Sequence, residues 1–264
     1  THSVGVVRDA IVEWHYKNHL YDALAPGVFW MLPVVAETYD GVLNDINGFH
    51  VKKEDVFSAL DSASSDVEEG CVGGGTGMNC YEFKGGIGTS SRVTHIAEKD
   101  YTLGVLVQAN FGAREQLTIA GIPMGQAFRD VPKLRAVMDT PPDTGSIIVI
   151  VATDAPLLPH QLKRLVRRVP MGMARTGTTG GHYSGDIFLA FATGNHVPLA
   201  AEAPIAVHML PHSQMDPLFD ATAEAVEEAI LNALCAAETM IGQQGRTVHA
   251  LPLDRLQQIM ADYS

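Results

Sequence analysis

The stretch GSIIVIVATDAPLLPHQLKRL, residues 145–165, decides how this chain folds. Residues 146–153 form a continuous run of mostly apolar, β-branched side chains, and this pattern predicts a strand buried on both faces of a sheet. Asp154 and Pro156 then begin a helix whose apolar and basic residues lie on opposite sides. The sequence therefore predicts a serine, Ser146, at the first position of a core strand.

Upstream of this strand, apolar spacing predicts a helix at the start of the chain and a short helix around residues 56–60. The apolar run at residues 28–36 predicts a buried strand. Residues 101–109 predict another strand, with residues 117–122 as its hairpin partner. Residues 129–145 contain three prolines and no clear period, so they predict a loop that leads into the core strand.

Downstream, the pattern predicts strands at residues 187–192 and 248–251 and helices at residues 216–240 and 253–261. Buried strands mixed with amphipathic helices predict an α+β fold in which helices cover sheets. The chain contains no internal repeat and no low-complexity tract.

The composition narrows the function classes. With 264 residues, 46% of them hydrophobic and 18% charged, the chain is globular rather than disordered. The net charge of −12 argues against a nucleic-acid partner. No apolar run approaches the roughly 20 residues of a membrane helix. Three cysteines are too few for a disulfide framework and no signal peptide is visible, so we expect a cytoplasmic protein; because the chain starts without Met, the periplasm stays open.

Three motifs invite a metal, phosphate or thiol interpretation, and each has a simpler one. His208 and His212 are four residues apart, but Pro211 lies between them, so we expect a surface loop and no metal site. The glycine runs at residues 73–77 and 85–88 lack the Gly-Lys-Ser/Thr of a phosphate loop, which favours tight turns at a sheet edge, although such loops also bind oxyanions through backbone amides. No cysteine lies beside a histidine, which favours burial of the three: Cys71, Cys80 and Cys235.

The junction of Gly145 and Ser146 has two interpretations. It is an ordinary loop end, or it is a bond at which the serine hydroxyl attacks the preceding carbonyl. Glycine suits the second, because it offers no side chain to hinder the attack. Hydrolysis after such an acyl shift would leave Ser146 as a new N-terminus. Its amine, with a pKa of about 7.7–8.0, would then act as the base for its own hydroxyl.

Four segments together resemble the self-processing L-aminopeptidase/D-amino-acid esterase-amidases and their β-peptidyl aminopeptidase relatives. They are residues 33–45, 70–92, 101–112 and 145–165. The resemblance covers nearly the whole chain and is specific. Members of this family carry a long portion before the segment that matches residues 1–3.

The resemblance implies a nucleophile and its support. Ser146 would be the nucleophile, first for cleavage after Gly145 and then for substrate. A single catalytic domain, residues 1–264, would divide into an α chain 1–145 and a β chain 146–264. Ser184 and Asp186 match the family's supporting serine and acidic residue; taken alone, they are an ordinary turn residue and a loop cap.

Three further residues match the family's substrate site. Asn110 would donate its amide to the oxyanion, although asparagine at a strand end also favours a turn. Glu37 would bind the free ammonium of the substrate, and Tyr39 would hydrogen-bond the reacting centre. Their simpler interpretations are a surface carboxylate and a half-buried aromatic ring.

The fold implied by the resemblance is a four-layer αββα sandwich that resembles the N-terminal-nucleophile hydrolases with a different connectivity. The implied substrates are small peptides, amides or esters with a free amine; no metal or cofactor is needed, and the implied assembly is a homotetramer. Two alternatives stay open. One is a related self-cleaving acyltransferase, a class that usually has Thr at the scission, and the other is a binding protein of this fold that is not processed.

Overall fold

The computed structural model describes residues 2–19, 30–134, 145–198 and 201–263. The chain divides into two compact units, and each is described by itself. The first comprises Thr1–Glu37, Asp45–Val67 and Val197–Ala206, and the second comprises Thr38–Asn44, Glu68–His196 and Val207–Ser264. The prediction of one catalytic domain over residues 1–264 stays a prediction.

The first unit contains the two helices expected near the start of the chain, α1 (Val4–Lys17) and α2 (Lys53–Asp61), with a short 3₁₀ turn η1 (Ile46–Gly48) between them. The helices contact each other through Trp14, whose indole N–H donates to the Asp61 carboxylate over 2.8 Å. At the start of α2 the Asp55 carboxylate accepts a hydrogen bond from the backbone N–H of Lys52 over 2.8 Å, whereas the cap residue of α1, Ser3, makes no side-chain hydrogen bond.

The strand predicted at residues 28–36 is wrong where it can be tested. Residues 28 and 29 lie outside the described residues, and residues 30–36 form no strand. Trp30, Leu32 and Val34 are 70–80% exposed. An apolar run becomes a strand only when a neighbouring strand pairs with its backbone, and none of the described strands does so here.

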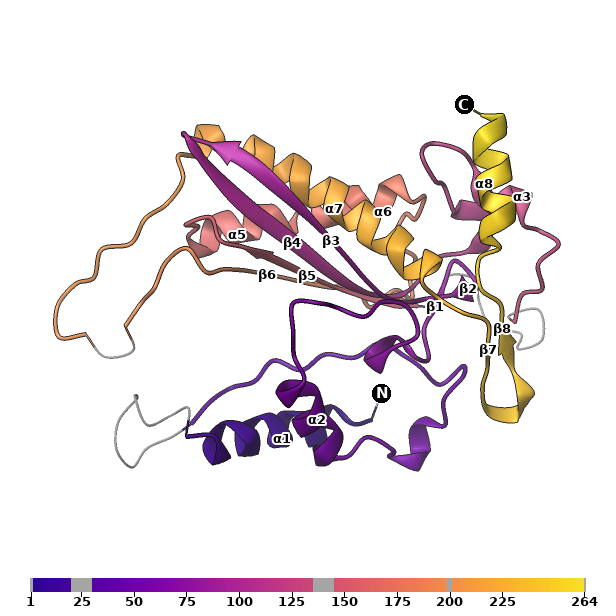
Figure 1. The fold of residues 1–264 in the computed structure, drawn as a ribbon, viewed down its shortest axis with the longest axis horizontal. Helices are drawn as coiled ribbons and strands as arrows, with labels where there is room; N and C mark the ends of the chain where they lie inside the picture. Colours follow the sequence, from indigo (N-terminus) through magenta and orange to yellow (C-terminus); the bar gives the residue numbers. More distant parts are fainter. Residues whose placement is uncertain (1, 20–29, 135–144, 199–200, 264) are drawn as a thin grey trace. The chain divides into compact units, whose positions relative to one another are not determined.

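The second unit is built on a four-stranded sheet of order β3-β4-β5-β6 (Figure 1). Strands β3 (Gly86–Ile96) and β4 (Lys99–Asn110) form an antiparallel hairpin, β4 pairs with β5 (Ser146–Thr153) antiparallel, and β5 pairs with β6 (Ile187–Ala192) parallel. The predictions of β4, β5 and β6 are confirmed. The hairpin partner of β4 is β3, and not residues 117–122, where only the isolated bridge Ile119–Ile122 occurs.

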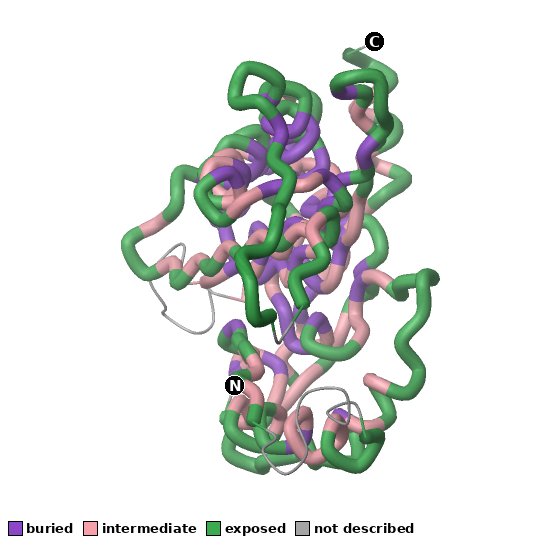
Figure 2. The backbone as a smooth tube through the Cα atoms, turned by 90° about the vertical axis from the view of Figure 1, so that its left-hand side faces the viewer, coloured by how far each residue is buried: buried purple, intermediate pink, exposed green. Residues whose placement is uncertain are grey.

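Three helices pack against this sheet or against each other: α5 (Pro159–Val166), α6 (Val169–Arg175) and α7 (Asp216–Cys235). Helix α7 packs on β3 and β4, α5 contacts β6, and α6 contacts α7 (Figure 1). Buried positions concentrate in these packed elements and loops are mostly exposed (Figure 2). Burial alternates along β5, where Ile147, Val149 and Val151 are fully buried while the intervening residues are half-buried. The prediction of a strand buried on both faces therefore holds for one face only.

The remaining elements are short, apart from a closing helix. Helix α7 ends five residues before the predicted end at residue 240, because Met240 pairs with Val248 in a small antiparallel ladder. No helix in the described ranges has the length and apolarity to cross a membrane. The remaining short elements and the closing helix α8 are η2 (Gly73–Gly75), β1 (Asn79–Cys80), β2 (Phe83–Lys84), η3 (Arg114–Gln116), α3 (Met124–Ala127), η4 (His212–Gln214), β7 (Met240–Ile241), η5 (Gln243–Gly245), β8 (Thr247–Val248) and α8 (Leu253–Asp262).

The two glycine runs form closely packed backbone. A Cβ at Gly75 would lie 2.4 Å from the carbonyl oxygen of Gly70, and one at Gly86 would lie 2.1 Å from it. The fully buried Lys84 links the runs, because its ammonium donates to the carbonyls of Gly75 (2.9 Å) and Gly85 (2.7 Å). Burial lowers the pKa of Lys84. These contacts support the interpretation of the glycines as tight backbone packing.

We expect Gly88→Ala to destabilise the protein through the contact of β3 with α7. A Cβ at Gly88 would lie 1.9 Å from the Ala229 carbonyl oxygen, so the helix must move, at a cost of about 1–3 kcal/mol of unfolding free energy. The matched control is Gly104→Ala on β4, where a Cβ meets nothing within 4 Å. Urea denaturation measures both. Equal losses in the two variants would contradict this packing.

Candidate active site

Ser146 lies where three strands of the sheet meet. It is the first residue of β5 and pairs directly with Asn110, the last residue of β4. On the other side, the parallel register of β5 with β6 begins with Ile148 opposite Ile187, so the residues before β6 lie beside the start of β5. The core strands thus bring Asn110, Ser146 and Asp186 together at one end of the sheet, where β4 ends and β5 and β6 begin.

The bond before Ser146 is held by backbone contacts. The carbonyl oxygen of Gly145 accepts a hydrogen bond from the N–H of Gly185 over 3.2 Å. A Cβ at Gly145 would lie 2.2 Å from the Asn110 carbonyl oxygen and 2.9 Å from the Phe111 Cα. Gly145 is therefore required by the close approach of the end of β4, a reason that the sequence did not show.

Ser184 and Asp186 form a pair beside this bond. The Ser184 hydroxyl donates to the Asp186 carboxylate over 2.5 Å, and both side chains are half-buried. Gly185 between them contacts Ser146, since a Cβ on Gly185 would lie 3.8 Å from the Ser146 Cβ. The Ser-Gly-Asp turn thus contacts residues 145 and 146 through its central glycine.

The Asn110 carboxamide is oriented on both sides. Its oxygen accepts from the backbone N–H of Asn79 (2.8 Å), and its NH₂ donates to the Tyr39 carbonyl (3.0 Å). Asn110 is 6% exposed, so these bonds hold it in one orientation. The phenol of Tyr39 packs on Gly41, where a Cβ would lie 2.5 Å from its hydroxyl oxygen. Tyr39 therefore meets Asn110 through its backbone carbonyl.

Asn79, whose backbone N–H contacts Asn110, carries an unsatisfied polar atom in its side chain. Its side-chain oxygen is buried and has no hydrogen-bond partner among the described residues. Leaving a buried acceptor unpaired costs about 1–3 kcal/mol, so such an atom is uncommon in a folded protein.

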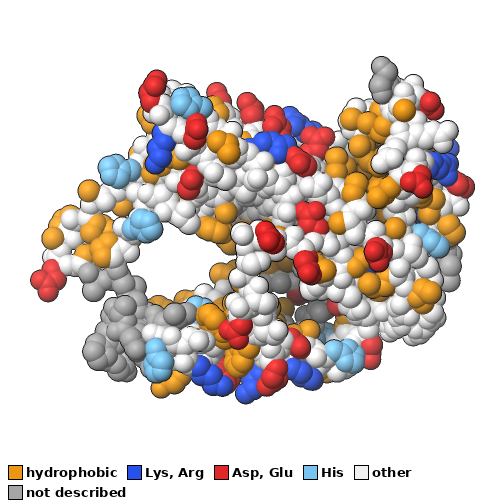
Figure 3. Space-filling view, in the orientation of Figure 1, with side chains coloured by type: hydrophobic (Ala, Val, Ile, Leu, Met, Phe, Trp, Pro, Cys, Tyr) orange, Lys and Arg blue, Asp and Glu red, His pale blue; other side chains and the backbone are white. Residues whose placement is uncertain are grey.

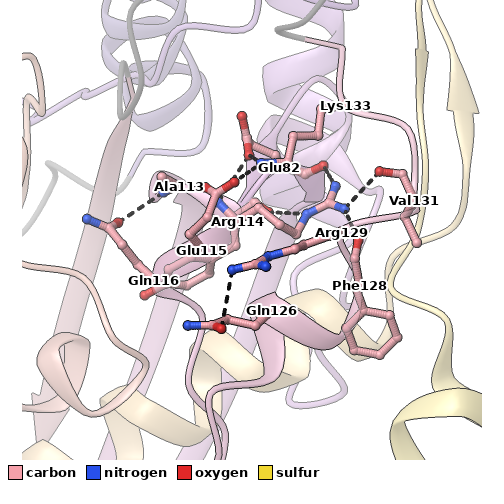
Figure 4. A network of polar contacts seen from close by, with 11 residues as sticks. Glu82, Ala113, Arg114, Glu115, Gln116, Gln126, Phe128, Arg129, Val131 and Lys133 are labelled. Atoms are coloured by element: carbon pink, nitrogen blue, oxygen red, sulfur yellow. Dashed lines mark hydrogen bonds and ion pairs between the residues drawn. The ribbon is translucent and has the colours of Figure 1, made fainter.

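Arg114 anchors the loop that follows Asn110 (Figure 4). Its guanidinium is fully buried and donates to the carbonyls of Tyr81 (3.1 Å), Phe128 (3.1 Å), Val131 (3.2 Å) and Glu82. Burial lowers the pKa of Arg114 to about 10, against the opposing charge of the Glu82 carboxylate. The guanidinium thus stays charged near neutral pH. The surrounding carbonyls solvate this charge, and the nearby Glu82 carboxylate balances it.

This anchor holds an unusual stretch of backbone. Tyr81 and Glu82 have φ of 52° and 58°, a left-handed conformation that non-glycine residues rarely adopt. Arg114 binds both of their carbonyls, and the Tyr81 N–H donates to the Phe111 carbonyl over 2.7 Å. Because Asn79 precedes this stretch, Arg114 also stabilises the position from which Asn79 contacts Asn110.

The cysteines do not take part in this arrangement. Cys80 is fully buried, and burial raises the pKa of its thiol to about 12. A thiol that stays neutral is a poor nucleophile. Cys71 is half-buried, and its sulfur contacts the backbone of Glu238. Cys235 is exposed as a residue, while partial desolvation of its sulfur, with the Glu69 carboxylate as a second cause, raises the pKa of its thiol. The prediction that all three cysteines are buried is therefore confirmed for Cys80 only.

The structure places the predicted site residues as follows. It brings together Tyr39, Asn110, Gly145, Ser146, Ser184 and Asp186 in the second unit. Glu37 belongs to the first unit, so its assignment stays a prediction. Sequence reasoning missed Asn79, Arg114 and the N–H of Gly185. For Arg114 the one available signal was an arginine that follows the predicted strand at residues 101–109 by only a few positions.

Acidic side chains are spread over the face shown in Figure 3, and basic ones are scarcer there. This distribution agrees with the net charge of −12.

Solved structures with the same fold define the class of this protein. The L-aminopeptidase D-Ala-esterase/amidase from Ochrobactrum anthropi, described as a prototype for the serine aminopeptidases and a new variant among the Ntn hydrolase fold, is 45% identical with a TM-score of 0.91. The match covers 100% of this chain and 72% of that one. A Burkholderia sp. beta-aminopeptidase gives 48% identity and a TM-score of 0.89, covering 99% and 72%. The fold is α+β and of the Ntn hydrolase type, as predicted.

The chain belongs to peptidase family S58, which it matches over residues 1–248. It is 50% identical to the beta-peptidyl aminopeptidase BapA of Sphingosinicella microcystinivorans, over 100% of this chain and 68% of that protein. It is 43% identical to BapA of Sphingosinicella xenopeptidilytica, over 98% and 66%. The chain therefore spans about two thirds of the length of these curated relatives. It is a hydrolase with aminopeptidase activity, and the expected family resemblance is confirmed.

We expect Cys80 to resist alkylation in the folded protein, because its buried thiol stays neutral far above pH 8. Iodoacetamide at pH 8 should leave the Cys80 peptide unmodified in a mass-spectrometric map, and hydrolysis should continue. The control is the same treatment in guanidinium chloride, where unfolding exposes Cys80 and alkylation should be complete. Rapid modification of native Cys80 would contradict its burial.

Proposed function

We propose that this protein cleaves itself between Gly145 and Ser146 and then uses the freed Ser146 as the nucleophile of a serine aminopeptidase. One observation carries the proposal: the sheet places Ser146 directly beside Asn110 on one side and the Ser184–Asp186 turn on the other. A nucleophilic hydroxyl, an amide donor and a hydroxyl–carboxylate pair are the parts that acyl transfer needs.

Self-cleavage would begin with attack of the Ser146 hydroxyl oxygen on the Gly145 carbonyl carbon. The Ser146 nitrogen is still part of the peptide bond at that stage, so it is not basic. We assign the hydroxyl proton to the Ser184–Asp186 pair, whose hydrogen bond joins a hydroxyl to a carboxylate. The C–N bond then breaks, the nitrogen gains a proton, and water hydrolyses the resulting ester to a Gly145 carboxylate.

Turnover would use the new amine. With a pKa of about 7.7–8.0 for an α-amino group, much of it is neutral near pH 8 and accepts the hydroxyl proton of Ser146. The hydroxyl oxygen attacks the substrate carbonyl, and the Asn110 amide stabilises the oxyanion, which lowers the barrier by about 3–4 kcal/mol. The bond to the leaving amine or alcohol then breaks, the leaving group takes the proton from the Ser146 ammonium, and water hydrolyses the acyl-enzyme to free Ser146 again. Asp186 would hold the amine or the Ser184 hydroxyl in place, and Tyr39 would border the reacting centre.

The substrates would be short peptides, amides and esters with a free amine, including peptides that begin with a β-amino acid. The support is the named activity of the relatives, beta-peptidyl aminopeptidases and an L-aminopeptidase D-Ala-esterase/amidase. Glu37 would bind the substrate ammonium as an ion pair. Serine at position 146 favours hydrolysis over the acyltransferase alternative, and an assay with an amino-acid acceptor separates the two.

We further propose a homotetramer, as the family resemblance implies, and a cytoplasmic location, which the use of only three cysteines favours over the periplasm. Light scattering on the purified protein tests the assembly, and a mass near that of one chain would contradict it. Cell fractionation tests the compartment.

We expect Ser146→Ala to abolish both self-cleavage and hydrolysis, because the attacking oxygen is lost. Intact mass and N-terminal sequencing should show one uncleaved chain, and release of the amine from an aminoacyl amide should fall to background. The matched control is Ser91→Ala on the exposed part of β3, which should behave as wild type. Two fragments from Ser146→Ala would refute the assignment.

We expect Glu37→Gln to raise KM about 10- to 100-fold for substrates with a free amine, because a charge-assisted hydrogen bond is worth about 1.5–3 kcal/mol. Substrates with an acetylated amine should be affected far less. Glu54→Gln, an exposed carboxylate at the start of α2 in the same unit, is the control and should change neither. Equal effects of Glu37→Gln on free and blocked substrates would remove its role.

A further inference from the structure

The carbonyl of the bond to be cleaved already has a hydrogen-bond donor in the uncleaved chain. The Gly145 oxygen accepts from the Gly185 N–H over 3.2 Å. Gly185 lies between Ser184 and Asp186, in the turn that carries the proposed proton acceptor, and next to the Ser146 side chain. The donor, the nucleophile and the turn that carries the Ser184–Asp186 pair therefore adjoin one peptide bond.

Asn110 approaches the same bond from the opposite side. It is the backbone carbonyl of Asn110, and not its amide, that lies against the Cα of Gly145. The carboxamide is held by the Asn79 N–H and the Tyr39 carbonyl, and neither hydrogen bond involves the Gly145 oxygen. A carbonyl of a strand points toward one neighbouring strand only, and that of Gly145 points to the chain leading into β6.

From this geometry we propose that the Gly185 N–H is the oxyanion donor of self-cleavage, whereas the Asn110 amide serves substrate turnover. The inference rests on the proposed function and adds a division of labour to it. The same Ser146 would use two different donors in succession, so the maturation step and the hydrolytic step can be impaired separately.

The chemistry of the first step defines what this donor does. When the Ser146 oxygen bonds to the Gly145 carbon, the carbonyl π electrons move to the Gly145 oxygen, which becomes an oxyanion. The Gly185 N–H, already in hydrogen-bond contact with that oxygen, stabilises the developing charge without reorganisation. When the C–N bond breaks, the electrons return to form the ester carbonyl. Loss of one such donor costs about 100- to 1,000-fold in rate.

The test removes each donor separately in the full chain. Replacing Gly185 by glycolate through protein ligation changes the backbone N–H to an ester oxygen with almost no change in shape, and Gly185→Pro removes the same N–H genetically. Gly185→Ala keeps the N–H, and its Cβ would make only an ordinary contact with Ser146. Asn110→Ala removes the amide. Self-cleavage is followed by intact mass against time, and turnover by kcat/KM on an aminoacyl amide.

We expect the glycolate chain and Gly185→Pro to cleave themselves at least about 100-fold more slowly than wild type, and Gly185→Ala to stay within about fivefold. Asn110→Ala should still cleave itself within about tenfold of the wild-type rate, while its cleaved form loses about 100-fold or more in kcat/KM. Should Gly185→Pro fail to fold, judged by circular dichroism, the glycolate chain decides.

Wild-type cleavage rate in the glycolate chain, or an Asn110→Ala chain that stays whole while it folds, would overturn the division of donors and leave the proposed function standing. A different result would defeat the proposed function itself: wild-type protein that never cleaves, or Ser146→Ala that does. In that case the present inference is also refuted. The two failures are therefore distinguished by which variant behaves unexpectedly.

Discussion

The pairing of β4 with β5 is the constraint on which the candidate site depends. It places Asn110 opposite Ser146 and brings the end of β4 so close to residue 145 that only glycine fits. Side chains of a strand alternate between faces, so a shift of the register by one residue would move Ile147, Val149 and Val151 out of the core. The hydrophobic core therefore sets the register, and the register sets the geometry of the chemistry.

A buried charge supports the same region. Arg114 lies fully inside the protein, which is unfavourable unless every N–H has a partner. Backbone carbonyls of two stretches, residues 81–82 and 128–131, accept from the guanidinium, and its carbon lies 3.6 Å from the centre of the Phe83 ring. The Glu82 carboxylate accepts from the backbone N–H of Arg114. Loss of Arg114 would leave several carbonyls unpaired and release two left-handed residues. This polar cluster thus ties the loop after Asn110 to the rest of the core.

Sequence reasoning was most successful for strands with continuous apolar runs. Strands β4, β5 and β6 follow from such runs, as does α7 from its period. It missed β3, whose Gly, Ser, Thr and Arg residues lack an apolar alternation, because β3 is stabilised by its hairpin with β4 and by contact of its glycines with α7. It was wrong at residues 30–36, where an apolar run has no pairing partner among the described strands.

The sequence by itself determined which chemical groups are present: a serine after a glycine at the head of a core strand, an asparagine at the end of another, and a Ser-Gly-Asp turn before a third. Only the tertiary structure decided which of them meet, and through which atoms. The Gly185 N–H, the Asn79 N–H and the Tyr39 carbonyl are backbone groups that every residue of their kind carries, so no residue type marks them in advance. Their roles arise from strand register and loop packing, which depend on contacts between residues far apart in the chain.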